Sequence, residues 1–479
     1  MNSAVKKPDF PVMLVRTARY MHGYTVTQPL GILYLASTLR NHGYRNIRLI
    51  DMRPECMDAV RLMEYVREFK PRFLGLSSLS YESPTVAEIV NAVRKFDPTI
   101  HISIGGPFPS SMMEKSFEIT PVDSIVIGEG ERTITQLVDA VADASESPRE
   151  APLSGIPGLL YLHKGSVAGT PHHDYIQDIN QLPLPAWDML DITEYFGLRN
   201  FNFLHKYSNY MSIMTTRGCP YRCAYCHNVL GKKYRKRSVD SVMHEIRTLI
   251  GDYGIREFHI IDDSFNLDLD RAKAIMDELS KIRPRVAIAF PNGLRGDHLD
   301  EEFLVKAKAA GVYKINFAIE TASPRLQKKI NKNLALEKAR EMISISNRLN
   351  IISHGFFMFG FPTETEAEML QTVDFALASH LHSANFFIVQ PFEGTDIFEM
   401  FKQQHPEMSL ETDRHNYYEA NFEIYEIPRK RIQEIVKDAH RRFFLTPWRV
   451  LKLIRLIPRK STLFQCALPL LYRGFLGKG

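Results

Sequence analysis

The stretch TTRGCPYRCAYCHN, residues 215–228, holds three of the chain's five cysteines within eight consecutive positions. Cys219, Cys223 and Cys226 follow the spacing C-x-x-x-C-x-x-C, with an aromatic residue before the last cysteine and a histidine after it. Five cysteines in 479 residues are too few for a disulfide framework. The cluster therefore indicates a metal or redox site in a reducing compartment.

Three kinds of site are compatible with this cysteine spacing. Cys223-Ala-Tyr-Cys226-His227 matches c-type haem attachment, which requires export and leaves Cys219 unexplained, and the N-terminus carries no export signal. Structural zinc with His227 as fourth ligand lacks the second ligand pair that tetrahedral sites usually use. Three thiolates on one loop can instead bind three irons of a [4Fe–4S] cluster and leave the fourth iron open. We favour the iron–sulfur cluster.

The cysteines follow the first of six β-like runs that are separated by helical patterns. These runs are 211–216, 257–262, 285–290, 314–320, 352–360 and 385–390. Their alternation predicts a parallel sheet, and six βα units predict a partial barrel that stays open on one side. In barrels of this kind the chemistry gathers at the carboxyl ends of the strands. The cysteines fall at one such end, and further polar or glycine residues follow the other strands.

The first 145 residues show a separate alternation of apolar runs and helical patterns. Strand candidates are 11–15, 47–52, 73–80, 101–106 and 124–130, and helical patterns fit 28–43, 56–69, 84–96 and 132–142. This order predicts a Rossmann-like, doubly wound α/β sheet. We expect this domain at 8–146, a Pro- and Ser-rich linker at 147–205, the partial barrel at 206–400 and a helical C-terminal region at 401–479.

The C-x-x-x-C-x-aromatic-C spacing on the loop after the first barrel strand resembles that of the radical S-adenosylmethionine (SAM) enzymes. The resemblance implies that Cys219, Cys223 and Cys226 hold a [4Fe–4S] cluster and are both metal-binding and catalytic. It also implies that SAM chelates the open iron and that an electron cleaves it to methionine and a 5′-deoxyadenosyl radical. Tyr225 would lie against the adenine of SAM.

Two further segments resemble parts of the SAM site of that superfamily. IIDDSF, residues 260–265, takes the place of the usual Gly-Gly-Glu, so Asp262 or Asp263 should meet the SAM amino group in a charge-assisted hydrogen bond. Arg295, in NGLRGD, is expected to face the SAM carboxylate. An aspartate at a strand end can equally be only a helix N-cap.

FAIETAS and GFPTET complete the resemblance to the SAM site. The first makes Glu320 a candidate for the SAM ribose and amino group, with Ser323 behind it. The second resembles the turn that passes the adenine and places Gly360 and Pro362 there. Gly-Phe-Pro also occurs in ordinary turns.

Radical SAM enzymes that carry a Rossmann-like domain in front resemble this chain along almost its whole length, and they form the cobalamin-binding class. The resemblance rests on QPLGILYLASTLRNHG, IRLID, GLSSLS, GGPFPS and VIGEGE. It implies that cobalamin lies at the strand ends, against Ser77, Ser78, Gly105, Gly106, Gly128, Glu129 and Gly130. The alternative is a flavodoxin-like domain that binds nothing or another nucleotide, and no Gly-x-Gly-x-x-Gly favours NAD.

The N-terminal domain departs from cobalamin-binding relatives at two places. No Asp-x-His-x-x-Gly motif follows Asp51, so the lower-axial histidine of methionine-synthase-like domains is missing. Relatives often read Gly-Gly-Pro-His, whereas Phe108 follows Pro107 here. Because phenylalanine cannot coordinate cobalt, we expect no lower-face ligand from this loop.

Charge and hydropathy narrow the class of partner. The net charge of +5 is small for this length and implies no nucleic-acid role. WRVLKLIRLIPRK, near the C-terminus, mixes Leu and Ile with Arg and Lys. Such a helix either lies on an anionic membrane surface or docks on the open side of the barrel. We expect a cytoplasmic protein, peripheral to the membrane if the first reading holds, in which case the substrate would be a lipid or another hydrophobic molecule.

The resemblance implies a cobalamin-dependent radical SAM enzyme with SAM, cobalamin and a [4Fe–4S] cluster as cofactors. We expect a C-methyltransferase that acts on an unactivated carbon of a small molecule, with a flavodoxin or ferredoxin as reducing partner. The same architecture also serves oxidative cyclisation and rearrangement. A non-catalytic Fe–S and cobalamin redox sensor is the alternative of another class, and the crowded strand ends argue against it.

Overall fold

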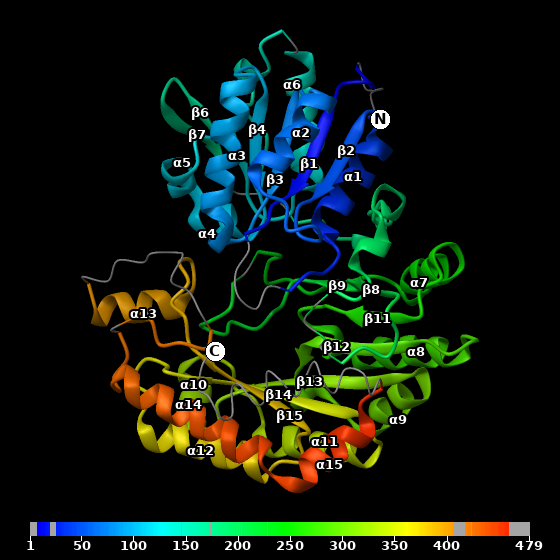
Figure 1. Cartoon of the computed structure of the whole chain (residues 1–479), viewed down its shortest axis with the longest axis vertical. Coiled ribbons are helices and arrows are strands. Elements are labelled where there is room, and N and C mark those ends of the chain that lie inside the picture. Colours follow the sequence, from blue (N-terminus) through cyan, green and yellow to red (C-terminus); the bar gives the residue numbers. More distant parts are fainter. Residues whose placement is uncertain are drawn as a thin grey trace. The chain divides into compact units, whose positions relative to one another are not determined.

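The structure is a computed structural model, and it describes residues 7–19, 25–144, 146–171, 175–198, 200, 202, 204–227, 229–406, 417–422 and 424–458. The chain divides into two compact units (Figure 1). The N-terminal unit comprises residues 1–200 with 228–231, and the C-terminal unit comprises 201–227 with 232–479. Each unit is described by itself.

The N-terminal unit is built on one sheet in the order β2-β1-β3-β4-β5-β6-β7. Its strands are β1 Val12–Arg16, β2 Ile47–Asp51, β3 Phe73–Ser77, β4 His101–Gly105, β5 Ser124–Val126, β6 Leu159–His163 and β7 Ser166–Thr170. The first five pair in parallel, as the apolar runs predict, whereas β6 and β7 pair antiparallel. The switch of strand order at β1 and β3 is that of a doubly wound sheet.

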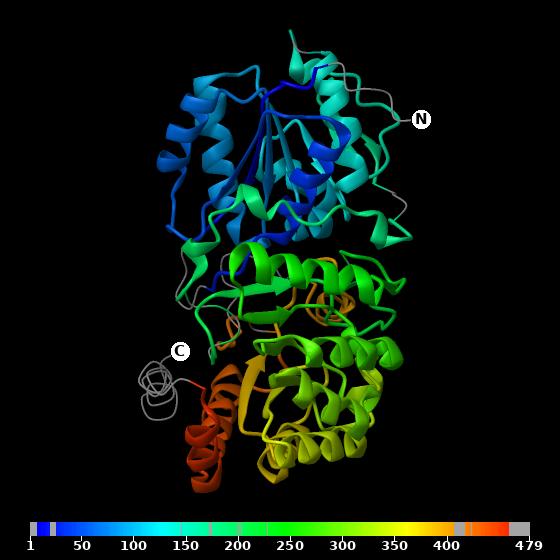
Figure 2. The same cartoon turned by 90° about the vertical axis from the view of Figure 1, so that its right-hand side faces the viewer.

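Helices cover both faces of this sheet (Figure 2). One face carries α1 Leu30–His42 and α6 Glu131–Asp143, and the other carries α2 Ala59–Phe69, α3 Ser83–Phe96, α4 Pro107–Met112 and α5 Ser116–Ile119. Alternate residues of β1 enter the two cores, with Leu14 on the α1 side and Met13 on the α2 side. This explains why residues 12–15 of the strand are all apolar, and the two-sided covering confirms the predicted α/β fold.

The segment expected to be a plain linker, 147–205, contributes two strands to the sheet. β6 and β7 form a hairpin whose register places Lys164 and Gly165 in the loop, with φ of 50° and 80°. Two successive residues with positive φ are typical of the tight turns that suit twisted hairpins. The surrounding Pro and Ser residues hid this signal in the sequence. Farther on, Tyr195 is buried and donates a 2.5 Å hydrogen bond to Asp51.

The C-terminal unit contains a curved sheet of six parallel strands in sequential order. They are β8 Tyr210–Ile213, β11 Glu257–Ile260, β12 Ala287–Leu294, β13 Val312–Glu320, β14 Ile352–Phe359 and β15 Ser383–Ile388. Between them run the helices α7 Val239–Tyr253, α8 Leu269–Lys281, α9 Glu301–Ala310, α10 Pro324–Lys329, α11 Leu336–Arg348 and α12 Glu366–Ala378 (Figure 1). Among the described residues β8 and β15 form no pair with each other, so the barrel is partial, as predicted.

Among the described residues, three helices follow the last strand: α13 Asp396–Gln404, α14 Arg429–Phe444 and α15 Pro447–Leu456. The guanidinium of Arg449 on α15 is buried and donates to the carbonyls of Ala376, Leu377, Ser379 and Leu381, at and beyond the end of α12. Residues 447–457 thus dock on the barrel. The remainder of the basic tail, 459–479, lies outside the described residues, and membrane contact stays a prediction. Within the described ranges, no helix is both long and apolar enough to cross a bilayer.

Replacing Arg449 by alanine is expected to lower the free energy of unfolding by about 2–3 kcal/mol, because four carbonyls lose a charged donor. Denaturant unfolding followed by circular dichroism measures the loss. Arg455→Ala, at an exposed position of the same helix, is the control and should change stability by no more than about 0.5 kcal/mol. Equal midpoints for the two variants would contradict the anchoring role of Arg449.

Candidate functional site

The cysteine loop is fixed at its base and at its middle. Strand β9, Thr216–Arg217, pairs antiparallel with β10, Arg235–Lys236, and closes the base of the loop. In the middle, the Ala224 amide donates to the Ile330 carbonyl at 2.9 Å, and the Ile397 amide donates to the Ala224 carbonyl at 2.9 Å. Backbone hydrogen bonds on both sides therefore hold the loop in one conformation.

The three thiols on this loop are free. Cys219 is partly exposed, Cys223 is buried and Cys226 is exposed, and none of them forms a disulfide. A hydrogen bond from the Cys226 thiol lowers the pKa of Cys223 to about 6, with burial opposing the change. Two thiols in direct contact, with a third four residues upstream, form a soft donor set of the kind that iron–sulfur clusters use.

The two adjacent aspartates, Asp262 and Asp263, have different surroundings in the structure. Asp262 is buried and accepts hydrogen bonds from the backbone amide and the hydroxyl of Thr215, so it ties the end of β8 to the end of β11. Asp263 is exposed and forms no hydrogen bond within the described residues. The surrounding protein and the charge of Asp262 raise the pKa of Asp263 to about 6. Of the pair, Asp263 has the carboxylate that a ligand can reach.

Glu320 ends β13 in a left-handed conformation, with φ of 68°, which is uncommon for a residue with a side chain. Its carboxylate is buried, and burial raises its pKa. Ser323, expected behind it, caps α10: its hydroxyl accepts from the Leu326 amide at 3.2 Å and donates to Glu368 at 2.6 Å. Ser323 therefore fixes the turn after Glu320. The left-handed backbone of Glu320 is a strained conformation of the kind often found at functional sites.

Lys332 is a neighbour of this site that the sequence motifs did not indicate. Its side chain is buried, and its Nζ lies 3.6 Å from Oε1 of Glu320. Its charge contributes to the lowered pKa of Cys223. Asn331 and Asn333 on either side have φ of 54° and 47°, so the chain makes a tight turn that turns the ammonium inward. In the sequence, only the Asn-x-Asn pattern indicated this turn.

Arg295 has internal partners in the structure. Its guanidinium pairs with Asp297 at 2.9 Å, donates to the Lys332 carbonyl at 2.9 Å and lies 4.1 Å above the ring of Tyr221. These contacts brace the cysteine loop and the Lys332 turn against each other. Because the carboxylate of Asp297 already occupies the guanidinium, the expected contact of Arg295 with the SAM carboxylate stays a prediction.

The Gly-Phe-Pro turn adjoins the aromatic residue of the cysteine motif. Gly360 has φ of 86°, Pro362 is buried, and the Phe361 ring lies 6.3 Å from the Tyr225 ring. The amides of Gly360 and Phe361 both donate to Oε2 of Glu364, at 2.6 and 3.0 Å. The turn and Tyr225 thus form one apolar corner beside the cysteines.

Glu364 should make stability depend on pH. Burial raises its pKa from 4.5 to about 8, although the two amide hydrogen bonds oppose this. The folded protein therefore favours the protonated form, and this contribution is lost as the pH rises through about 8. Between about pH 5 and about pH 9 we expect wild type to lose about 2 kcal/mol or more of unfolding free energy relative to Glu364→Gln. Urea unfolding at both pH values measures this, and parallel pH curves would contradict it.

The glycines of the N-terminal unit mark a close approach of backbone segments at the strand ends. Gly106 has φ of 95°, and a Cβ there would lie 3.1 Å from the Ser77 hydroxyl. Gly128 has φ of 72° and donates to the Ser110 hydroxyl at 2.9 Å, and a Cβ on Gly130 would meet Leu35 at 3.1 Å. The positive φ values of Gly106 and Gly128 favour glycine, and the lack of side chains at these two positions fits the approach of a large flat cofactor.

The other residues predicted to contact cobalamin differ in their surroundings, and so does Phe108. Gly105 leaves ordinary space, since a Cβ would come no closer than 3.7 Å to Val126. Ser78 is buried and its hydroxyl is enclosed, so Ser77 is the accessible member of the pair. Glu129 is buried and accepts from the Ile176 amide at 3.0 Å. Phe108 is fully buried in the core against α2 and α3, and the absence of a lower-face ligand from this loop stays a prediction.

Comparison with known families tests the two units separately. Residues 213–376 match the family model of the radical SAM superfamily, and residues 21–138 match that of the B12 binding domain. The chain is a radical SAM enzyme with a B12-binding domain. The first match covers the cysteine loop and most of the partial barrel, and the second covers most of the doubly wound sheet.

Curated relatives align with the radical SAM enzyme across both units. An uncharacterized methyltransferase of Pyrococcus horikoshii is 28% identical over 88% of this chain and 89% of its own length. Cytidylyl-2-hydroxyethylphosphonate methyltransferase of Streptomyces wedmorensis is 27% identical over 78% of this chain and 77% of its own. Anaerobic magnesium-protoporphyrin IX monomethyl ester cyclase of Rubrivivax gelatinosus is 22% identical, over 87% and 74%.

A solved structure shares the fold. The radical SAM methyltransferase TsrM of Kitasatospora setae, with cobalamin and a [4Fe–4S] cluster bound, superimposes with a TM-score of 0.67 at 21% identity. The match covers 83% of this chain and 78% of that one. The cofactors of the radical SAM enzyme are accordingly a [4Fe–4S] cluster, SAM and cobalamin.

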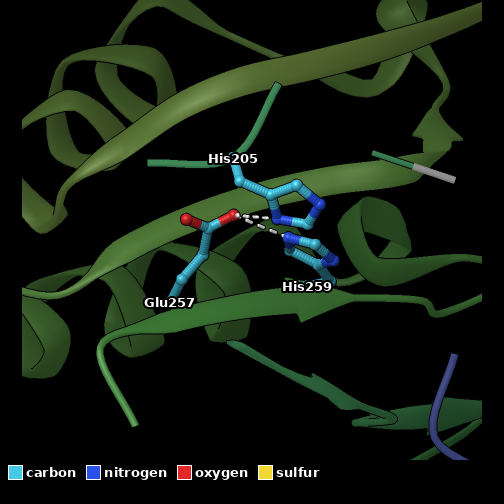
Figure 3. Close-up of side chains that lie close together, drawn as sticks. All are labelled: His205, Glu257 and His259. Atoms are coloured by element: carbon cyan, nitrogen blue, oxygen red, sulfur yellow. Dashed lines mark hydrogen bonds and ion pairs between the residues drawn. The ribbon is translucent and has the colours of Figure 1, made fainter. Parts of the chain in front are cut away.

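A buried cluster of potential metal ligands lies near the amino ends of the barrel strands. His205, Glu257 and His259 place their ligand atoms within 4.8 Å of one another, and both imidazoles point at the same carboxylate (Figure 3). His259 Nε2 lies 2.7 Å from Oε1 of Glu257, and His205 Nδ1 lies 3.4 Å from it. Burial alone would raise the pKa of Glu257, but the two histidines outweigh it and hold the pKa well below its usual range.

We interpret this cluster as a hydrogen-bond network. Oε1 of Glu257 also accepts from the Tyr313 hydroxyl at 2.7 Å, and Oε2 accepts from the amides of Lys206 and Tyr207 at 2.7 Å each. A register shift in β13 lets both Tyr313 and Lys314 reach Asn202. A saturated carboxylate with an ammonium nearby is a poor site for a cation, and the network ties β11 and β13 to the segment that precedes β8.

Proposed function

We propose that the enzyme is a cobalamin-dependent C-methyltransferase that acts at an unactivated carbon of a small molecule. The observation that carries this proposal is the alignment of both units, over 88% of the chain, with a relative named a methyltransferase. TsrM, which shares the fold, is also named a methyltransferase, and another TsrM structure holds tryptophan as its substrate. Electron supply by a flavodoxin or ferredoxin belongs to the proposal.

Bound to this protein, the cluster and SAM supply a radical that removes hydrogen from carbon, and cobalamin supplies the methyl group. The chain's own residues have five tasks in this proposal. Cys219, Cys223 and Cys226 hold the cluster on a loop that is already fixed. Asp263 accepts from the SAM amino group, because its carboxylate is accessible and has no other partner within the described residues.

The remaining SAM contacts divide between charge and shape. The Lys332 ammonium neutralises the SAM carboxylate and holds Glu320 in place at 3.6 Å. Tyr225 and Phe361, whose rings are 6.3 Å apart, form the apolar corner against which the adenine lies. In the N-terminal unit, Gly106, Gly128 and Ser77 form the edge on which cobalamin lies.

Conversion of SAM tests the proposal without knowledge of the substrate. Anaerobically reconstituted enzyme with hydroxocobalamin and a strong reductant should convert SAM to both S-adenosylhomocysteine and 5′-deoxyadenosine, measured by liquid chromatography and mass spectrometry. Omission of cobalamin should remove only S-adenosylhomocysteine. Formation of 5′-deoxyadenosine alone, with cobalamin bound, would contradict methyl transfer.

Oxidative cyclisation is the second candidate, because the cyclase of Rubrivivax gelatinosus aligns over 87% of this chain. It predicts the same cleavage of SAM but a product that gains no methyl group. Complete lack of SAM turnover by cluster-loaded protein would favour the redox sensor over both enzymes.

A further inference from the structure

The inner face of the barrel keeps accessible side chains in the middle of buried strands. Accessible and buried residues alternate over the last four residues of β14, 356–359, and along β15, and the accessible ones are Phe356, Met358, Ser383, Asn385 and Phe387. Their buried neighbours pack outward, since Phe357 contacts Phe375 of α12 and Phe386 contacts Phe443 of α14. Alternation therefore directs the accessible set to the opposite, inner face.

The strand register arranges these side chains in rows. Phe356 is paired with Ala318 on one side and Asn385 on the other, and Met358 is paired with Phe387. A Cβ on Gly293 of β12 would lie 3.4 Å from Ala318 and 3.5 Å from Phe356. Small residues on β12 and β13 thus lie beside the Phe356 ring of β14.

The aromatic rings continue from this face to the cysteine loop. Phe356 and Phe387 are 5.9 Å apart, and Phe387 is 5.9 Å from the half-exposed Tyr417. Tyr417 is 5.8 Å from Phe392, which lies 5.7 Å from His227, the residue after Cys226. We call Phe356, Asn385, Phe387 and Tyr417 the aromatic face, and ring contacts through Phe392 connect it to His227 beside Cys226.

Asn385 is the polar group of the aromatic face. The residue is partly accessible, and its side-chain amide forms no hydrogen bond within the described residues. The row below it is satisfied internally: His354 is 2.7 Å from the Ser383 hydroxyl, and Asn316 donates to the Pro291 carbonyl at 2.7 Å. An amide in mid-strand without a partner is unusual, and it offers both a donor and an acceptor to a ligand.

Strands β14 and β15, which carry most of the aromatic face, contain no Asp, Glu, Lys or Arg. Lys314, the nearest inward ammonium on β13, is buried and bonded to Asn202 at 3.0 Å. Burial, together with Lys314, lowers the pKa of His354 and keeps the imidazole neutral. A ligand portion that lies here gains from ring contacts and from one amide rather than from charge.

We propose that the aromatic face binds a planar, uncharged aromatic group of the substrate, with its ring against Phe387 and its polar edge on the Asn385 amide. The inference rests on the proposed function only for the identity of the ligand as substrate. It names an aromatic group where the sequence allowed a lipid or another hydrophobic molecule only if the C-terminal helix lay on a membrane, because accessible aromatic rings and a single side-chain amide favour flat, polar-edged molecules over flexible chains.

Saturation-transfer NMR with three probes tests the proposal on full-length, cluster-loaded enzyme. The probes are indole, 1-methylindole, which lacks the N–H donor, and octanamide, which has an amide but no ring. Wild type should bind indole about five- to tenfold more tightly than either of the other two. Asn385→Ala should lose this preference for indole over 1-methylindole, and Phe387→Leu should weaken both indoles by a similar factor.

A matched control separates this site from unspecific binding of rings. Phe96→Ala removes an exposed phenyl group on α3 of the other unit and should leave indole affinity unchanged. Octanamide binding as tight as indole, or wild-type indole affinity in Asn385→Ala and Phe387→Leu, would overturn the proposal. SAM conversion by wild type is scored separately, so failure of the proposed methyl transfer is distinguished from failure of the aromatic site.

Discussion

Cys223→Ala is expected to lose the iron–sulfur cluster and to lower formation of 5′-deoxyadenosine from SAM by about 100-fold or more. Each thiolate holds one iron, so two remaining ligands cannot retain the cluster. Cys223 is the buried member of the three, and its position is fixed by backbone bonds at Ala224 that the substitution leaves intact. The fold should therefore survive while the site is lost.

Iron and sulfide content, visible absorbance and 5′-deoxyadenosine yield together measure this loss. Cys56→Ala is the matched control, because Cys56 is an exposed thiol of the N-terminal unit far along the sequence from the motif. It should keep wild-type iron and turnover. A Cys223→Ala protein that still binds four irons and cleaves SAM would contradict the assignment of the loop.

Lys332→Met is expected to raise the KM for SAM by about 10- to 100-fold while the cluster is retained, because a buried charge-assisted contact is lost. A second effect follows from the 3.6 Å contact with Glu320. Lys332 opposes the rise that burial imposes on the pKa of Glu320. Without the ammonium that pKa rises further, so the acidic limb of the pH–rate profile should move to higher pH.

Steady-state SAM cleavage across a range of pH values measures both effects. Lys328→Met, at an exposed position of α10, is the control and should leave KM and the pH profile unchanged. Lys332→Arg should restore a large part of the SAM affinity, because it keeps the positive charge. A normal KM together with an unshifted pH profile in Lys332→Met would show that this lysine only packs.

The fold was predictable because the apolar positions that define each strand and helix lie close together in the sequence. β1 reads VMLVR, and every residue in it is buried. The cysteine motif comes directly after the first apolar run of the barrel, which places it on the loop after the first barrel strand. The hairpin β6–β7 escaped because its signal is two residues, Lys164 and Gly165, within a Pro- and Ser-rich segment. Short turn signals carry less weight than repeated apolar positions.

The site was predictable in its motifs but not in its electrostatics. Two adjacent aspartates look alike in the sequence, yet Asp262 is committed to Thr215 while Asp263 is free for a ligand within the described residues. Lys332 belongs to a turn twelve residues after Glu320, and only tertiary packing brings their charges together. Arg295 likewise shows its ion pair with Asp297 only in three dimensions.

The anchored α15 covers apolar residues at the amino ends of two barrel strands. Ile457, which directly follows it, packs with Leu204, with Ala287 at the start of β12 and with Ile352 at the start of β14. Loss of this helix would expose that apolar surface to water, so the C-terminal segment protects the barrel from association with other molecules.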